Sequence, residues 1–371
     1  MTPPRRRVVS EGTRCRGTDI PIPRRILIIQ LRRIGDVIFT LPAIQVLRRA
    51  FPQARIDFLV EEPADQLVRL APGRDETLVY DKSRALHWLA EVRRRRYDWV
   101  LDFLANGRSL PLTLCSGAAV KAAFQGRWVR RLAYNRLVKA TPNAYLVEQK
   151  LDILRALGVA DASWRYDIRL PAEELRWAQE TLKSLGADPR RPLVAMAPAS
   201  RRETRRWLPE RFAEVARALL GQGRDVLLLW GPGELGYVED IARRTDGGQG
   251  PAAPGGQAFS SPGRGHLIIP SDTPLLRLAA LIKSAKLVLS VENGPKNLAV
   301  ALGVPTVNVV GPNNPGSFNP SGDPAHVLIR AEGLECLGCE LNHCPTDHEC
   351  MTTVTAGTVL KPIERLLAQG A

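Results

Sequence analysis

The chain of 371 residues has no uninterrupted run of about 18 apolar residues, so no segment is predicted to span a bilayer. Its first 23 residues are basic but lack the apolar core of a secretory signal peptide, and we expect residues 1–23 to be a disordered lead-in. Without an export signal the expected location is the cytoplasm, where disulfides are rare. The six cysteines therefore call for another explanation.

Acidic residues are also few. The 38 Asp and Glu residues stand against 52 Lys and Arg, and the net charge is +14. This excess favours an anionic partner, which could be a nucleic acid, an acidic membrane surface or a phosphorylated small molecule. Residues 125–139 mix basic side chains with Trp128 and Tyr134, a pattern compatible with nucleic-acid binding or with a solvated helical face.

Two common nucleotide-binding motifs are missing. The sequence has no Walker A lysine motif and no G-x-G-x-x-G after its first strand, which argues against P-loop kinases, ATPases and NAD dehydrogenases. What the chain does contain is a repeated alternation of strand and helix patterns, typical of parallel α/β sheets. We predict two doubly wound domains, 24–170 and 171–355, and a C-terminal segment, 356–371, that is helical. Residues 246–265 are rich in Gly, Pro, Ser and Ala and are expected to form a flexible insertion.

The most informative stretch is residues 24–42. An apolar strand, 26–29, is followed by a basic loop, 31–36, and then by a helical pattern over 37–47. Asp36 lies where strand passes into helix, the edge at which ligands bind in open parallel sheets. It is a candidate general base, and a helix N-cap is the structural alternative. The same loop supplies three candidate acceptor-side residues, Arg32, Arg33 and Gly35.

Three turns in the second half could bind a nucleotide. Residues 198–209 carry four arginines that could grip a diphosphate, or could simply be solvated. Residues 231–234 form a Gly-rich turn ending in Glu234, a candidate ribose ligand or a helix cap. Residues 292–296 form a strand-to-helix turn with Gly294, where helix amides could bind phosphate.

Four of the cysteines cluster near the C-terminus, within residues 336–350. They could form a small structural zinc site or an iron–sulfur site, or they could be reduced thiols in an ordinary loop. Their spacing matches no standard zinc finger. The candidate ligands are Cys336, Cys339, Cys344 and Cys350.

Taken together, four segments resemble the family 9 glycosyltransferases, the bacterial lipopolysaccharide heptosyltransferases. The segments are LIIQLRRIGDVIFTLP (27–42) with its continuation to residue 60, RRWLPERFAEVARALL (205–220), VENGPKNLAVALGVPTVNVVGPNNP (291–315) and CLGCELNHCPTDHECM (336–351). The resemblance implies a GT-B fold, in which two Rossmann-like domains face each other across a cleft. It also implies an inverting, metal-independent transfer of heptose from ADP-heptose to the lipopolysaccharide inner core.

The resemblance also implies roles for individual residues. Asp36 falls at the family's catalytic base, Arg205 at its phosphate-binding lysine and Glu234 at its ribose-contacting glutamate. Glu292 falls at an aspartate that contacts the donor sugar. The remaining donor-side candidates are Arg206, Asn293, Gly294 and Asn297.

Four of these positions depart from the family pattern. Arg205 stands where the family has lysine, which keeps the charge, and three further changes face the donor. The family's aspartate is replaced by Glu292, its Ser/Thr by Asn293 and its histidine by Asn297. A second interpretation therefore keeps the fold but assigns another nucleotide-sugar donor or weak activity. The expected surroundings are the cytoplasmic side of an anionic inner membrane, with no nucleic-acid partner. A non-enzymatic nucleic-acid-binding protein is the third interpretation, based on the net charge of +14 and on residues 125–139.

Overall fold

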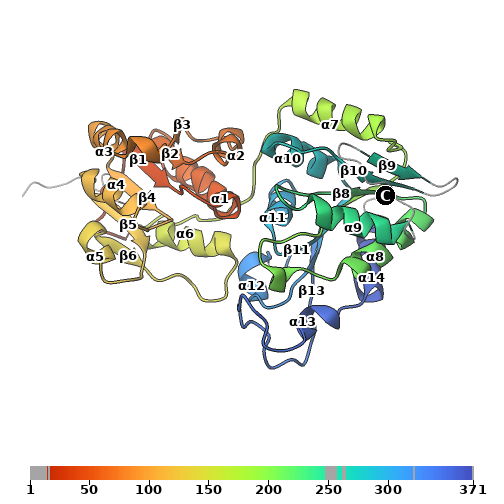
Figure 1. Cartoon of the computed structure of the whole chain (residues 1–371). Helices are drawn as coiled ribbons and strands as arrows, with labels where there is room; N and C mark the ends of the chain where they lie inside the picture. The colour runs from red at the N-terminus through yellow and green to blue at the C-terminus, as the bar shows by residue number, and fades with distance from the viewer. Residues whose placement is uncertain (1–14, 16, 247–256, 261–264, 321, 370–371) are drawn as a thin grey trace, which may run out of the picture. The chain divides into compact units, whose positions relative to one another are not determined.

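The computed structural model describes residues 15, 17–246, 257–260, 265–320 and 322–369 (Figure 1). These residues form two compact units, which divide between Arg165 and Tyr166. The sequence had placed the division five residues later, after residue 170. No helix within the described ranges is long and apolar enough to cross a membrane.

Unit 1, up to Arg165, is built on a six-stranded sheet in which every pair of neighbouring strands is parallel. Strand β1 is buried over four of its five residues, which explains its nearly continuous apolar sequence. In spatial order the strands are β3 (Glu76–Val79), β2 (Arg55–Val60), β1 (Arg25–Ile29), β4 (Trp99–Asp102), β5 (Val120–Phe124) and β6 (Arg136–Val138).

The helices of unit 1 form two layers on opposite faces of this sheet (Figure 1). In one layer α1 packs against α2 and α6, and in the other α4 packs against both α3 and α5. Their bounds are α1 (Ile34–Ala50), α2 (Asp65–Leu70), α3 (Ala85–Arg94), α4 (Ser109–Cys115), α5 (Arg130–Ala133) and α6 (Leu146–Ala156), with a 3-10 turn, η2 (Lys82–Arg84), before α3.

The strand order of unit 1 reverses between β1 and β4. The chain runs from β1 outward to β2 and β3, returns to β4 on the other side of β1, and continues to β5 and β6. The loops that leave β1 and β4 therefore diverge, and such a switch point is where ligands bind in open α/β sheets. The loop after β1 leads to Asp36.

Unit 2, from Tyr166 onward, has a seven-stranded sheet in which only the edge strand β9 is antiparallel. Its order reverses between β7 and β11, which creates a second switch point. In spatial order the strands are β13 (His326–Ile329), β12 (Thr306–Val309), β11 (Leu287–Val291), β7 (Leu193–Ala197), β8 (Asp225–Leu228), β10 (His266–Ile269) and β9 (Gln257–Ser260).

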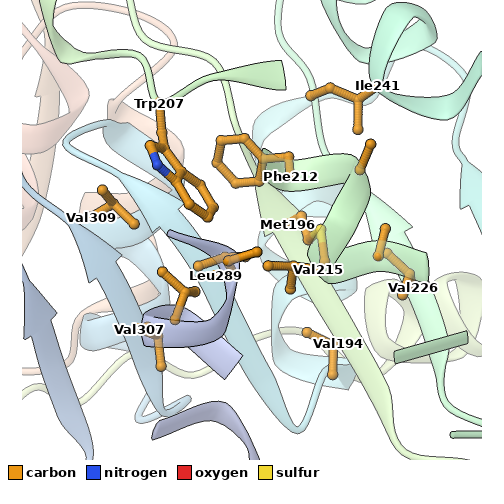
Figure 2. Packing of buried hydrophobic residues seen from close by; sticks show 14 of the residues in the cluster. Val194, Met196, Trp207, Phe212, Val215, Val226, Ile241, Leu289, Val307 and Val309 are labelled. Atoms are coloured by element: carbon orange, nitrogen blue, oxygen red, sulfur yellow. The ribbon is translucent and has the colours of Figure 1, made fainter. Parts of the chain in front are cut away.

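One hydrophobic core of unit 2 lies between the sheet and helices α8, α9 and α14. Figure 2 shows Trp207 and Phe212 packed over Met196, Leu289 and Val309, all of them buried. The helices are α7 (Ala172–Ser184), α8 (Pro209–Gly221), α9 (Leu235–Thr245), α10 (Leu275–Ser284), α11 (Gly294–Ala301), α12 (Pro315–Phe318), α13 (Glu349–Thr352) and α14 (Ala356–Gln369), with a 3-10 turn, η3 (Glu203–Arg205), before α8.

Two predictions of disorder need correction. The lead-in is not disordered up to residue 23, because Ile20 is buried and the Trp99 indole donates a hydrogen bond to the carbonyl of Pro21 at 3.2 Å. The predicted insertion contains strand β9, which pairs with β10. Residues 1–14, 16, 247–256 and 261–264 lie outside the described part of the chain.

Candidate active site

Asp36 lies in the first turn of α1, directly after the loop that leaves β1. The N-cap position belongs to Arg33, so Asp36 is not the cap that the structural alternative assumed. Arg33 has a φ of 64°, a left-handed conformation that costs energy for a residue other than glycine and is often found at functional sites. Asp36 is half-buried and accompanies Gly35 at this strand-to-helix turn.

A buried lysine acts on Asp36 from another element. Lys150, on α6, is 8% exposed, and its Nζ donates hydrogen bonds to Gln30 Oε1 at 3.1 Å and to the carbonyl of Phe103 at 3.2 Å. Burial raises the pKa of Asp36, while the positive charges of Lys150 and Arg33 lower it in part. Burial lowers the pKa of Lys150, which the charge of Asp36 partly offsets. The raised pKa makes Asp36 a stronger base than an ordinary surface carboxylate.

The loop after β4, on the other side of the switch point, is fixed by Asp102. This fully buried carboxylate accepts hydrogen bonds from the backbone N–H groups of Leu104 and Ala105 at 3.0 and 2.8 Å. The hydroxyls of Thr113 and Tyr134 donate to its other oxygen. Because all these partners belong to the chain itself, Asp102 holds the loop that carries Phe103 and so supports Lys150.

The predicted acceptor-side arginines remain exposed at the same edge. Arg32 lies 3.8 Å from Glu61, which also accepts a hydrogen bond from Arg108 at 2.8 Å. Glu61 follows β2, so charged side chains from three loops meet beside β1. Arg32 and Arg33 can thus offer positive charge to an acidic or phosphorylated ligand beside Asp36.

In unit 2, Glu292 directly follows β11 and is buried. Its Oε1 accepts hydrogen bonds from Asn308 Nδ2 at 2.5 Å and Asn319 Nδ2 at 3.2 Å. Lys296, which is fully buried, places its Nζ 3.9 Å from the same oxygen and donates to the carbonyl of Phe318. The structure thus places Glu292 in an internal polar network. The sequence had predicted only a position in contact with the donor sugar.

Asn293 connects the two loops at the switch point of unit 2. Its Oδ1 accepts from the Lys296 N–H at 2.9 Å and caps α11, while its Nδ2 donates to the carbonyls of Ala197 and Ala199. A Cβ at Gly294 would meet no described atom within 4 Å, so its backbone is open to a ligand. Asn297, 7% exposed, has a buried Oδ1 without a hydrogen-bond partner among the described residues.

The predicted phosphate-binding arginines follow β7, beside this turn. Arg205 ends the short turn η3, and its guanidinium lies 6.0 Å from the ring of Phe318. Arg206 donates from Nε to the carbonyl of Ser200 at 2.7 Å and lies 5.5 Å from the ring of Tyr237. Ser200 in turn donates to the carbonyl of Glu292 at 3.1 Å. The β7 and β11 loops, with their donor-side candidates, are therefore one hydrogen-bonded assembly.

Glu234 occupies the N-cap position of α9, after β8. Its carboxylate accepts a hydrogen bond from the Gly231 N–H at 2.9 Å and closes the Gly-rich turn, rather than capping the helix amides. The side chain is half-buried. Its proposed contact with ribose is not tested by this arrangement and stays a prediction.

The four C-terminal cysteines line one small cavity of about 40 Å³, together with His348. His348 Nε2 lies 2.6 Å from the carbonyl oxygen of Thr204, and burial raises the pKa of Cys350 to about 11. Across the described ranges, no group of three or more His, Cys, Asp or Glu side chains is placed to hold a metal ion. The predicted zinc site is therefore not confirmed.

Two Rossmann-like units in one chain, each with ligand-edge loops at a switch point, define the GT-B class of glycosyltransferase folds. The family model described as Glycosyltransferase family 9 (heptosyltransferase) matches residues 86–348. The chain belongs to this family and is a glycosyltransferase, as the sequence predicted.

Similar proteins support this assignment over most of the chain. Lipopolysaccharide heptosyltransferase 3 of Escherichia coli K12 is 24% identical, over 92% of this chain and 97% of that protein. Lipopolysaccharide core heptosyltransferase OpsX of Haemophilus influenzae is 24% identical, over 79% of this chain and 80% of its own length. Lipopolysaccharide heptosyltransferase 1 of Escherichia coli O18:K1:H7 is 26% identical, over 84% of this chain and 93% of that protein.

Solved structures confirm the predicted fold. The family 9 glycosyl transferase from Veillonella parvula superposes with a TM-score of 0.77 at 24% identity, covering 93% of this chain and 97% of that one. The Escherichia coli ADP-heptose lps heptosyltransferase II gives a TM-score of 0.72 at 19% identity, covering 93% of this chain and 99% of that one.

Proposed function

We propose that the protein transfers heptose from ADP-heptose to the inner core of lipopolysaccharide, with inversion at the anomeric carbon. The relatives named above act as lipopolysaccharide heptosyltransferases, and the observation that carries the proposal is the position of Asp36. It is a half-buried carboxylate with a raised pKa at the switch point of unit 1. This is the location and protonation behaviour expected of a general base.

In the proposed step, Asp36 takes the proton of an acceptor hydroxyl. The electron pair of the former O–H bond then forms the new bond from the acceptor oxygen to the anomeric carbon. At the same time the bond from that carbon to the diphosphate oxygen breaks, and ADP leaves. The new glycosidic bond lies on the opposite face of the sugar from the departing ADP. Arg32 and Arg33 would bind acidic or phosphorylated groups of the acceptor beside the base.

Unit 2 would hold the donor. Arg205, Arg206 and the open amides at Gly294 would neutralise the diphosphate as it leaves, so no metal is needed for the step. Glu234 would bind the ribose. Because Glu292 already accepts hydrogen bonds from Asn308 and Asn319, we propose that it positions the residues of the sugar site and does not itself bind the sugar.

A different nucleotide sugar is the second candidate for the donor. The observation behind it is Asn297, whose buried, unpartnered Oδ1 offers an acceptor where the family pattern has histidine. An unsatisfied buried oxygen is costly, and a ligand hydroxyl would remove that cost. We still consider ADP-heptose the first candidate, because the family model and the three similar proteins described above are heptosyltransferases.

Nucleotide titration separates the two donors. We expect isothermal calorimetry to show tighter binding of ADP than of UDP or GDP, and Arg205→Ala to weaken ADP binding about tenfold or more through loss of a charged hydrogen bond. Arg217→Ala, an exposed arginine on α8, is the matched control and should bind ADP normally. Tighter binding of UDP or GDP would favour the other donor.

The pH profile tests the partnership between Asp36 and Lys150. The base works only when deprotonated, so kcat/KM should fall as the pH drops through the pKa of Asp36. Lys150→Met removes a positive charge that lowers this pKa. The fall in kcat/KM on the acidic side of the pH profile, the acidic limb, should therefore move to higher pH. Lys150→Arg keeps the charge and should restore the limb. An unmoved limb in Lys150→Met would show that Lys150 does not act on the base.

The proposed place of action is the cytoplasmic face of the inner membrane. Lipopolysaccharide precursors carry a lipid anchor, so the acceptor would be presented at a bilayer surface. The net charge of +14 favours approach to anionic lipid, and that attraction should weaken with salt.

A further inference from the structure

One face of unit 1 exposes large apolar side chains. Helices α3, α4 and α5 lie side by side on the sheet face opposite α1 (Figure 1). Four residues on or next to them are strongly exposed: Leu86 at 82%, Trp128 at 74%, Leu132 at 64% and Leu114 at 48%. These are four of the six large apolar residues exposed among those described, and we refer to this surface as the α3–α5 face. Such a concentration marks an interaction surface.

The same face is strongly basic. Between Asp102 and Glu148 the chain has seven Lys and Arg residues and no Asp or Glu, and of the seven Arg108 belongs to the ligand edge, where it pairs with Glu61. Arg127 and Arg131 flank Trp128 and are exposed, as is Arg136 on β6. On α3, exposed Arg93 adds to the charge, while Arg94 is paired with Glu91 at 2.7 Å. The face therefore combines apolar side chains with uncompensated positive charge.

We propose that the α3–α5 face binds the surface of an anionic lipid bilayer. Tryptophan and leucine insert at the boundary between headgroups and acyl chains, and neighbouring arginines pair with anionic headgroups. Trp128 lies in the turn that leads into α5, where its carbonyl accepts a hydrogen bond from the Arg131 N–H at 3.0 Å, and Leu132 lies on α5 four positions later. The inference deepens the proposed function, since it gives an enzyme with a lipid-anchored acceptor a specific surface for reaching it.

The composition of the face favours lipid over nucleic acid. A nucleic-acid site would use arginine and tryptophan, because bases stack on aromatic rings and phosphates pair with guanidinium groups. It would gain nothing from three exposed leucines. A bilayer uses all three residue types, and Leu86, Leu114 and Leu132 account for most of the exposed apolar side chains here.

Vesicle flotation of the full chain tests the proposal. We expect binding to vesicles of phosphatidylcholine with phosphatidylglycerol, and little binding to phosphatidylcholine alone. The double variant Trp128→Ser/Leu132→Ser should lose about tenfold or more in vesicle partitioning, because two apolar side chains no longer enter the bilayer. Arg127→Gln/Arg131→Gln should also weaken binding and flatten its salt dependence. Leu341→Ser, an exposed leucine of unit 2, is the matched control and should bind normally.

The outcomes distinguish this proposal from the enzyme itself. ADP affinity and the melting temperature should be unchanged in the two α3–α5 variants, because the substituted side chains are exposed and belong to unit 1. Vesicle binding that is absent, or equal in wild type and both variants, would overturn the bilayer assignment while leaving sugar transfer untouched. Loss of oligonucleotide binding in the variants, with unchanged vesicle binding, would assign the face to nucleic acid instead.

Discussion

Replacing Asp36 with asparagine is expected to lower kcat for sugar transfer by about 10²–10⁴-fold, the usual contribution of a general base. Asparagine keeps the size of the side chain but cannot accept the acceptor's proton. Binding of ADP should stay nearly unchanged, because Asp36 belongs to unit 1 and the proposed nucleotide ligands belong to unit 2. Steady-state transfer assays combined with calorimetry measure both effects.

A carboxylate at the same sheet edge provides the control for this experiment. Glu61 follows β2 and is paired with Arg32 and Arg108, and it has no proposed role in proton transfer. Glu61→Gln should retain most of kcat. Full activity in Asp36→Asn, or equal losses in the two variants, would remove Asp36 from the role of base.

Replacing Glu292 with glutamine should destabilise unit 2 by about 3 kcal/mol, because it leaves Lys296 as an uncompensated charge in a buried site. Lys296 is fully buried, and its Nζ lies 3.9 Å from Glu292 Oε1 and donates a hydrogen bond to the carbonyl of Phe318. The glutamine can keep hydrogen bonds to the asparagines around it but carries no charge. Urea unfolding with a probe in unit 2 measures the loss.

The double variant Glu292→Gln/Lys296→Met separates charge pairing from ordinary packing. Removing both charges should return the stability to within about 1–2 kcal/mol of wild type, because a buried ion pair is often close to neutral against apolar replacements. If Glu292 instead served mainly as a solvent-accessible sugar ligand, the single variant would lose donor affinity with little change in stability. That result would contradict the internal network described above.

The sequence predicted the buried strands of the fold well. Apolar runs at 193–197, 266–269 and 287–291 predict strands, and strands β7, β10 and β11 have these bounds. Helix α14 covers the amphipathic pattern over 356–369. The edge strands β6 and β13 were missed. Both are short and only partly buried, so they lack the continuous apolar sequence of a central strand.

The site was predictable only where it follows from local sequence. Asp36 could be placed from the strand-to-helix pattern around it. Lys150 could not, because it reaches Gln30 from 120 residues away. Its one signal was a lysine within residues 145–157, whose apolar spacing predicts an amphipathic helix. The contacts of Glu292 with Asn308, on the neighbouring strand β12, and with Asn319, in a later loop, could not be predicted either, because no spacing rule in the sequence links these positions.

We propose that this family 9 chain transfers heptose from ADP-heptose and uses Asp36 as its base. The most direct test incubates the purified protein with a lipopolysaccharide core acceptor and, separately, ADP-heptose, UDP-sugars and GDP-sugars, and measures acceptor-dependent nucleotide release. We predict release of ADP from ADP-heptose with wild type, and almost none with Asp36→Asn. Release from a UDP- or GDP-sugar but not from ADP-heptose would contradict the account.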